Sequence, residues 1–249
     1  MHIERIADTF MEITKNLYIY GSSASEIESY LYKIGISYNY DIQIACMGTV
    51  IYFTIIDEEG NSTTRIKRIT EIKIDFSNLK IWETLSEEII SNPPSFAVLR
   101  IKLEEAKSIT ENKNYSFIKL IFAVFIASYS FCIVFGGNFY DALFSAFSGF
   151  LSYIITYKIN NKISKDFFAG FTCHSFVNFF GLLTSLNSFS TLAGSIMVFV
   201  PGLLLTQGVL DLGERNFVTG TSKLVEATFV LGALIMGAGM SEAFWGYLI

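Results

Sequence analysis

The spacing of apolar positions changes along the chain, and each spacing predicts a different kind of element. Between residues 3 and 17 the apolar side chains recur every three or four positions, which indicates a helix that Gly21 can end. Ser22 or Ser23 can cap a second helix, which Gly35 would close. The chain is therefore expected to begin with two consecutive helices.

An alternating pattern then replaces the helical one. It predicts strands at 40–47, 49–57 and 62–69, with a turn at 58–61 between the last two. Two more helices are expected at 78–91 and 95–110, because the Pro93-Pro94 pair between them does not fit a helix interior. Residues 1–114 thus predict a small α+β domain built on an antiparallel meander.

Beyond residue 114, long apolar segments follow one another with short connections. Five segments reach the roughly 20 residues that cross a hydrocarbon core, at about 117–135, 139–157, 167–186, 189–210 and 224–247. The fold class expected for residues 115–249 is an all-α membrane bundle of five transmembrane helices, preceded by the α+β domain.

Basic residues lie in alternate connections of this bundle: Lys107, Lys113, Lys119, Lys158, Lys162, Lys165, Arg215 and Lys223. Because Lys and Arg concentrate on the cytoplasmic side, the N-terminus is expected inside and the C-terminus outside. Trp245 and Tyr247 would then lie at the outer interface. This pattern predicts a multi-pass protein of the bacterial inner (plasma) membrane.

Charge divides the chain in the same way. Residues 1–116 hold 12 Lys or Arg and 17 Asp or Glu, whereas residues 117–249 hold 6 of each. No basic cluster suits nucleic acid, and the three cysteines lack the spacing of a metal site or a disulfide framework. The N-terminus has no secretory signal pattern, so the first domain is expected in the cytoplasm.

The fourth apolar segment is interrupted by a Pro201-Gly202 pair. A break at membrane depth frees backbone groups, which transporters use for substrate and ion sites. Thr206 and Gln207 follow the break and favour a site, with a simple kink as the alternative. Asp211 is a further candidate: its spacing predicts an i, i+4 interfacial ion pair with Arg215, with a gating role as the alternative.

Other polar residues lie at overlapping depths and can converge with the break on one cavity. His174 can relay protons or remain a neutral imidazole bonded to Asn178, one turn later. Glu226 can couple protons or pair with Lys223. Glu242 and Asp141 lie toward the outer surface, where water explains them. Polar residues in a membrane are costly, which makes these groups candidates for function.

Three stretches resemble the threonine/serine exporter family: "FGGNFYDALFSAFSGF" at 135–150, "GSIMVFVPGLLLTQGVLDLGERNFVTGTSKLVEA" at 194–227 and "RIKRITEIKIDFSNL" at 65–79. The resemblance implies export of small amino acids or, in two-component members, of dicarboxylates such as succinate. It also implies a separate, smaller hydrophobic membrane protein that completes the exporter. Leu210 stands where relatives often carry Arg, which leaves the charge of the cargo open.

Two functions from different classes fit these observations. The first is a subunit of a secondary exporter, with the substrate near the broken fourth segment. The second is a membrane-anchored sensor or scaffold whose cytoplasmic domain binds a ligand or a protein. An enzyme is not expected, because no nucleophile–base set is visible, and no cofactor is expected. A homo-oligomer is compatible with either function.

Overall fold

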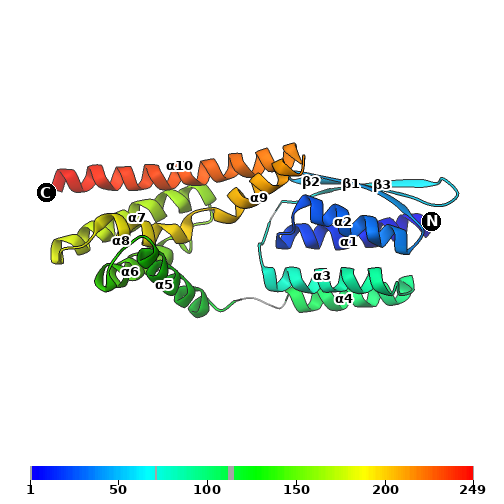
Figure 1. The fold of residues 1–249 in the computed structure, drawn as a ribbon, viewed down its shortest axis with the longest axis horizontal. Helices are drawn as coiled ribbons and strands as arrows, with labels where there is room; N and C mark the ends of the chain where they lie inside the picture. The colour runs from blue at the N-terminus through cyan, green and yellow to red at the C-terminus, as the bar shows by residue number, and fades with distance from the viewer. Residues whose placement is uncertain (1, 71, 112–114, 249) are drawn as a thin grey trace. The chain divides into compact units, whose positions relative to one another are not determined.

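The computed structural model describes residues 2–70, 72–111 and 115–248, and it divides into two compact units (Figure 1). The first unit comprises Met1–Asn114 together with Thr206–Lys223. The second comprises Tyr115–Leu205 together with Leu224–Ile249. The segment after the Pro-Gly pair, which the sequence assigns to the membrane half, therefore belongs to the first unit.

The first unit contains an antiparallel sheet and two layers of helices (Figure 1). Its strands pair in the order β1-β2-β3, as the predicted meander requires. The helices α1 and α2 cover the sheet, and α3 and α4 pack on the outer side of α1 and α2. The elements are α1 (His2–Tyr20), α2 (Ala24–Ser37), β1 (Asp41–Met47), β2 (Val50–Ile56), β3 (Ser62–Arg68), α3 (Phe76–Ser91) and α4 (Phe96–Glu111).

Alternation along β2 explains the core of this unit. Ile51, Phe53 and Ile55 are fully buried, whereas Tyr52 on the opposite face is 42% exposed. Because successive strand residues point to opposite faces, one face packs on the helices. Trp82 of α3 closes the core from the other side and is also fully buried.

Local signals fix the ends of the first two helices. Gly21 ends α1 with a φ of +106°, a conformation that costs glycine little. Ser23 caps α2 in a capping box with Glu26, whose carboxylate accepts the backbone N–H of Ser23 at 3.0 Å. The prediction that Gly35 closes α2 is wrong, because the helix continues to Ser37. Gly35 allows close packing instead, since a Cβ there would lie 2.8 Å from the Tyr40 carbonyl oxygen.

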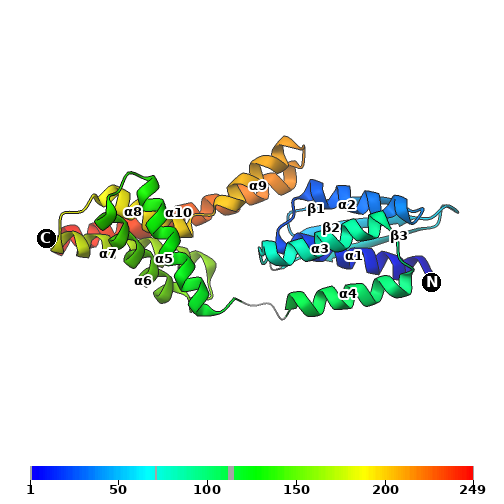
Figure 2. The ribbon, with the colours of Figure 1, turned by 60° about the horizontal axis from the view of Figure 1, so that its bottom comes forward.

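All regular elements in the described part of the second unit are helices, joined by short connections. It contains α5 (Phe117–Val134), α6 (Phe139–Thr156), α7 (Lys162–Leu183), α8 (Ser188–Ile196) and the short 3₁₀ helix η1 (Met197–Phe199). The helices α9 (Gly202–Gly213) and α10 (Phe217–Leu248) each have residues in both units. Figure 2 shows α9 beside the first turns of α10.

Among the described residues, α5, α6 and α10 are long and apolar enough to cross a membrane. The pair Ser188–Phe199 and Gly202–Gly213 meets the same criteria together and bends by 66°. The structure thus confirms a mostly helical protein and gives three candidate spans, or four with the bent pair, in the described part, where the sequence predicts five. The count of five spans stays a prediction, because α7 is not among these candidates.

Small residues bring the helices of the second unit together. A Cβ at Gly194 of α8 would lie 2.6 Å from the Cβ of Cys132 in α5, and one at Gly149 of α6 would collide with Ser128. Such contacts suit helices in lipid, where close backbone approach replaces a hydrophobic driving force. Gly137 is similarly crowded, whereas nothing lies within 4 Å of a Cβ at Gly232.

The assignment of Asp141 to a water-exposed outer surface is wrong. Its side chain is 1% exposed, and its two carboxylate oxygens each accept a backbone N–H at 2.9 Å, from Asn138 and from Asn187. Asp141 therefore completes the capping box of α6 and also holds the residue that caps α8.

Candidate functional site

The eight residues singled out from the sequence are divided between the two units. Thr206, Gln207 and Asp211 belong to the first unit, and the other five, Pro201, Gly202, Glu226, His174 and Asn178, belong to the second. The expected single cavity is therefore not a feature of either unit. Each unit contains its own polar group instead.

The polar group of the second unit lies between α7 and α10 and is called the histidine cluster here. It consists of His174, Ser175, Asn178, Ser241 and Glu242. The Ser241 Oγ lies 3.1 Å from the His174 Nδ1 and 2.7 Å from the Ser175 Oγ. On the other side of the ring, Nε2 lies 3.2 Å from the Glu242 carboxylate. From the sequence, water at the outer surface explained Glu242, whereas the structure gives its carboxylate a partner in His174.

Hydrogen-bond chemistry gives this cluster a direction. The Asn178 side-chain nitrogen lies 3.3 Å from the His174 Nδ1, and an amide nitrogen can only donate. Nδ1 therefore accepts, and the ring hydrogen lies on Nε2, facing Glu242. Ser241 then donates to Nδ1 and accepts from Ser175. Ser241 is fully buried, whereas the Glu242 side chain is 72% exposed, so the chain of bonds runs from the helix contact to an accessible carboxylate.

Two glycines allow α7 and α10 to approach closely enough to form this cluster. A Cβ at Gly170 would collide with the backbone of Leu234, and one at Gly237 would collide with the backbone of Phe167. Gly237 lies one turn before Ser241 on α10, and Gly170 one turn before His174 on α7. The glycine contacts thus set the distance across which the two polar side chains meet.

The break at Pro201 has an apolar setting in the second unit. Val200 is extended, with φ −66° and ψ 132°, and the Pro201 carbonyl accepts the Leu205 N–H at 3.1 Å as α9 begins. Phe199 and Val200 pack against an apolar cluster of α7 and α10 that includes Ala169. The residues just before the break therefore pack in an apolar setting.

Glu226 pairs with Lys162 at the start of α7, not with Lys223 as the sequence suggested. Both side chains are substantially exposed, at 45% for Glu226 and 59% for Lys162. An exposed pair of this kind contributes little to stability. The ion pair joins the beginning of α7 to α10.

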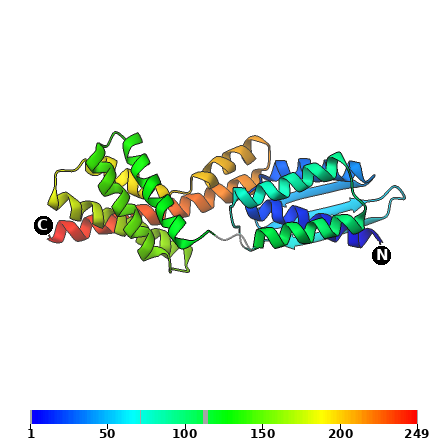
Figure 3. The same cartoon turned by 90° about the horizontal axis from the view of Figure 1, so that it is seen from below.

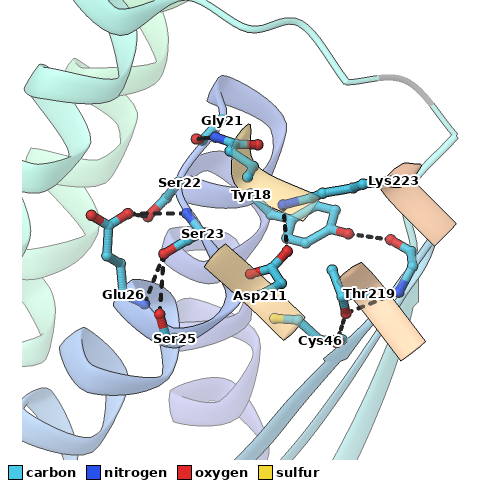
Figure 4. A network of polar contacts seen from close by, with 12 residues as sticks. Tyr18, Gly21, Ser22, Ser23, Ser25, Glu26, Cys46, Asp211, Thr219 and Lys223 are labelled. Carbon is cyan, nitrogen blue, oxygen red and sulfur yellow. Dashed lines mark hydrogen bonds and ion pairs between the residues drawn. The ribbon is translucent and has the colours of Figure 1, made fainter. Parts of the chain in front are cut away.

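The polar group of the first unit lies where the α9–α10 hairpin, residues 206–223, meets the N-terminal elements (Figure 4). Gln207 donates its side-chain N–H to the Gly21 carbonyl at 2.7 Å, at the end of α1. Thr219 donates to the Cys46 carbonyl at the end of β1. Gly220 allows the hairpin to close, since a Cβ there would lie 2.8 Å from the Gly208 carbonyl oxygen.

Asp211 pairs with Lys223, not with Arg215 (Figure 4). The Lys223 Nζ lies 2.8 Å from the Asp211 Oδ2, and the side chains are 10% and 0% exposed. Neither carboxylate oxygen of Asp211 receives a hydrogen bond of good geometry from a described residue. The contact is therefore an ion pair defined by distance. Arg215 turns the chain between the helices with a φ of +67°.

Burial and charge repulsion raise the pKa values of two side chains beside this ion pair, Glu28 and Cys46. Burial raises the pKa of the Glu28 carboxyl, and the charges of Asp211 and Glu214 raise it further, against the opposing effect of the Cys46 N–H that it accepts. Burial also raises the pKa of the Cys46 thiol to about 12, helped by the Glu28 and Asp211 charges. The surroundings therefore disfavour additional negative charge.

Sequence reasoning missed several members of both groups. The sequence contains too little signal for Ser175 and Ser241 of the histidine cluster and for Thr219 of the first unit, because single Ser and Thr residues are common near helix ends and contacts. It also contains no signal that Lys162 is the partner of Glu226. Among the described residues, no group of three or more His, Cys, Asp or Glu side chains could hold a metal ion.

The fold and these groups define a class: a membrane protein of several apolar helices with a separately packed α+β unit. Residues 8–245 match the model of a family described as "Putative threonine/serine exporter". Because the match covers nearly the whole chain, the protein belongs to this family. Searches of curated proteins and of solved structures found no match.

Proposed function

We propose that this protein is a subunit of a secondary exporter for small amino acids, with serine and threonine as cargo and succinate-like dicarboxylates as the alternative. It works in the bacterial inner membrane with a smaller hydrophobic partner. The N-terminus is cytoplasmic, and the C-terminus is outside after five spans. The protein is not an enzyme and uses no cofactor.

The histidine cluster is the observation that carries this proposal. Serine and threonine present an ammonium, a carboxylate and a hydroxyl, and the cluster offers a carboxylate, an imidazole, an amide and two hydroxyls. Polar and ionisable side chains on apolar helices mark pathways for substrates and ions. We therefore assign cargo binding to His174, Asn178 and Ser241.

The break at Pro201 has a different role in this proposal. Its apolar packing provides no hydrogen-bonding side chain for a cargo. A bend of 66° between α8 and α9 nevertheless supplies a place where the backbone direction can change during transport. Gln207 then acts by holding α9 to the end of α1, through the Gly21 carbonyl.

Gradient-driven transport in inside-out vesicles tests the proposal. The vesicles come from cells that co-express the chain and its partner, and labelled threonine, serine and succinate are offered from the former cytoplasmic side. We expect accumulation of at least one cargo when a gradient is imposed. Absence of accumulation for all three would refute the proposal for these cargoes.

A matched pair of substitutions then tests the site. Ser241→Ala removes the hydroxyl that bonds to His174, and we expect transport to fall by about tenfold or more, the loss of one hydrogen bond to a charged or polar group. Ser130→Ala removes an exposed hydroxyl of α5 that donates to the Ile126 carbonyl of its own helix, and transport should not change. Equal transport by both variants would place the cargo elsewhere.

A membrane-anchored sensor or scaffold is the second candidate function. The α9–α10 hairpin favours it, because this hairpin packs within the first unit and could report a ligand bound there. This function predicts that Gln207→Ala and Glu226→Gln leave activity intact, whereas substitutions within the first 110 residues abolish it. Cargo accumulation that depends on Ser241 would exclude it.

A further inference from the structure

A groove of about 560 Å³ lies between α1 and α4 of the first unit, far in sequence from the residues discussed so far. Figure 3 shows these two helices side by side. The volume lies within the range of small-molecule sites in proteins. All of its lining residues belong to α1 and α4, so the groove is a feature of the first unit alone.

The floor and one wall of the groove are apolar and fixed. Ile6 and Leu103 form the floor, at 2% and 3% exposure. Phe96 forms a wall, and its ring packs against Tyr38 with centroids 4.9 Å apart and against Phe10 at 6.2 Å. Tyr38 is itself held by a hydrogen bond to the Pro94 carbonyl at 2.6 Å. These contacts make the apolar part of the groove a preformed surface.

The carboxylates that line the groove all have cationic partners. Asp8 accepts a 2.6 Å hydrogen bond from Arg65 of β3. Glu12 and Glu104 share Lys107, whose Nζ lies 3.1 and 3.0 Å from them. Hydrogen bonds and charge attraction from both acids raise the pKa of Lys107 against the effect of its burial. Each carboxylate that lines the groove is therefore within ion-pair distance of a cation, with Lys107 shared by two of them.

The two arginines of the groove differ from its carboxylates. Arg5 of α1 and Arg100 of α4 both line it, and both side chains are exposed. No ion pair or side-chain hydrogen bond joins either guanidinium to any residue in the described part of the chain. Guanidinium groups bind carboxylates with paired hydrogen bonds. The groove thus combines an apolar floor with two unpaired carboxylate-binding groups.

We propose that the α1–α4 groove binds a small organic anion with an apolar body and a single carboxylate, such as a medium-chain fatty acid. The carboxylate lies at Arg5 and Arg100, and the apolar body lies on Ile6, Leu103 and Phe96. This site is separate from the histidine cluster and does not depend on the proposed export.

Titration calorimetry of the full chain in lipid nanodiscs tests this site, with octanoate as the probe and empty nanodiscs as the blank for partitioning. We expect saturable octanoate binding that the double variant Arg5→Gln/Arg100→Gln weakens by at least tenfold. Arg68→Gln is the matched control, because Arg68 is an exposed arginine on β3 that does not line the groove. This control should bind as the unmodified protein does.

Two further probes separate the contribution of the carboxylate from that of the apolar body. Octanol lacks the carboxylate, and acetate lacks the apolar body, so each should bind at least tenfold more weakly than octanoate. Equal binding of octanol and octanoate, unchanged binding by the double variant, or no saturable binding would each overturn the proposal. Both substituted arginines are exposed, and an unchanged thermal unfolding midpoint verifies that the double variant is folded.

Discussion

Asp211 and Lys223 show how much depends on single residues in the first unit. Both are buried, and their ion pair lies beside Glu28, whose carboxyl is itself partly buried. Removing two charges from water is unfavourable, and their attraction offsets this only while both are present. Removal of one charge therefore leaves the other buried without a partner where the hairpin packs against the N-terminal elements.

Substitution of one partner should destabilise the first unit strongly. Lys223→Met leaves the Asp211 carboxylate buried without a counter-charge, and we expect a loss of about 3–5 kcal/mol in the free energy of unfolding. The double variant Asp211→Asn/Lys223→Met should lose less, because no uncompensated charge remains. Denaturant unfolding followed by Trp82 fluorescence, in a Trp245→Phe background, measures both. A double variant less stable than Lys223→Met would contradict this account.

Glu28 gives the first unit a predictable dependence on pH. Burial raises its folded-state pKa above the ordinary value of 4.5, so the stability associated with its protonated form is complete below that value and is lost as the pH rises through the raised pKa. Glu28→Gln keeps an acceptor for the Cys46 N–H, and its amide has no proton to lose as the pH rises. We expect this variant to be more stable than the unmodified protein at pH 7 and equally stable at pH 4. Thermal unfolding of both proteins at pH 7 and pH 4 tests this expectation. An equal difference in stability at the two pH values would exclude Glu28 as the cause of the pH dependence.

At the scale of elements, close backbone contacts hold pairs of helices together. The α7–α10 pair meets through Gly170 and Gly237, whose missing side chains allow the backbones to touch. In lipid, such contacts stabilise a helix pair that hydrophobicity cannot hold together. The histidine cluster depends on this contact, because His174 and Ser241 lie on the two helices it joins.

Gly237→Val should separate α7 from α10 and disrupt the histidine cluster. The added side chain collides with the Phe167 backbone, which cannot yield as a flexible side chain would. We expect a lower thermal unfolding midpoint, and transport reduced at least as much as by Ser241→Ala. Gly239→Val is the control on the same helix, since nothing lies within 4 Å of a Cβ there. Equal effects of both variants would indicate a cost of helix substitution in general.

At the scale of the whole molecule, the chain passes between its two units more than once. It leaves the first unit near residue 114, returns to it at Thr206 and leaves again at Lys223. A small α+β unit is therefore completed by a hairpin that comes from late in the sequence. The hydrogen bonds of Gln207 and Thr219 to Gly21 and Cys46 can form only after residues 206–223 have been synthesised.

Cysteine labelling from the two sides of the membrane tests the expected orientation. Arg215→Cys places a thiol in the exposed hairpin turn, and Tyr247→Cys places one at a side chain that is 96% exposed. The native cysteines are buried, and the Cys46 thiol has a pKa of about 12, so they should react little at pH 7. An impermeant maleimide should label Arg215→Cys in inside-out vesicles and Tyr247→Cys in intact spheroplasts. Labelling of both from the same side would contradict a C-terminus outside.

The amino-acid sequence by itself determined the elements and the class of this protein. Helical spacing, alternation and long apolar runs report burial within one element, so they located the helices, the meander and the candidate spans α5, α6 and α10 without knowledge of neighbours. The break at Pro201 was equally visible, because proline acts on its own backbone. The family signature at 194–227 depends on the same local information.

Only the tertiary structure decided which residues meet. Spacing along a helix suggested Asp211 with Arg215 and Glu226 with Lys223, yet Asp211 pairs with Lys223 and Glu226 with Lys162. The assignment of Gln207 and Asp211 to the first unit likewise depends on residues far away in the sequence. A pattern along the chain contains no information on which distant segment fills a given contact, and burial of a charge becomes favourable only when that contact provides its partner.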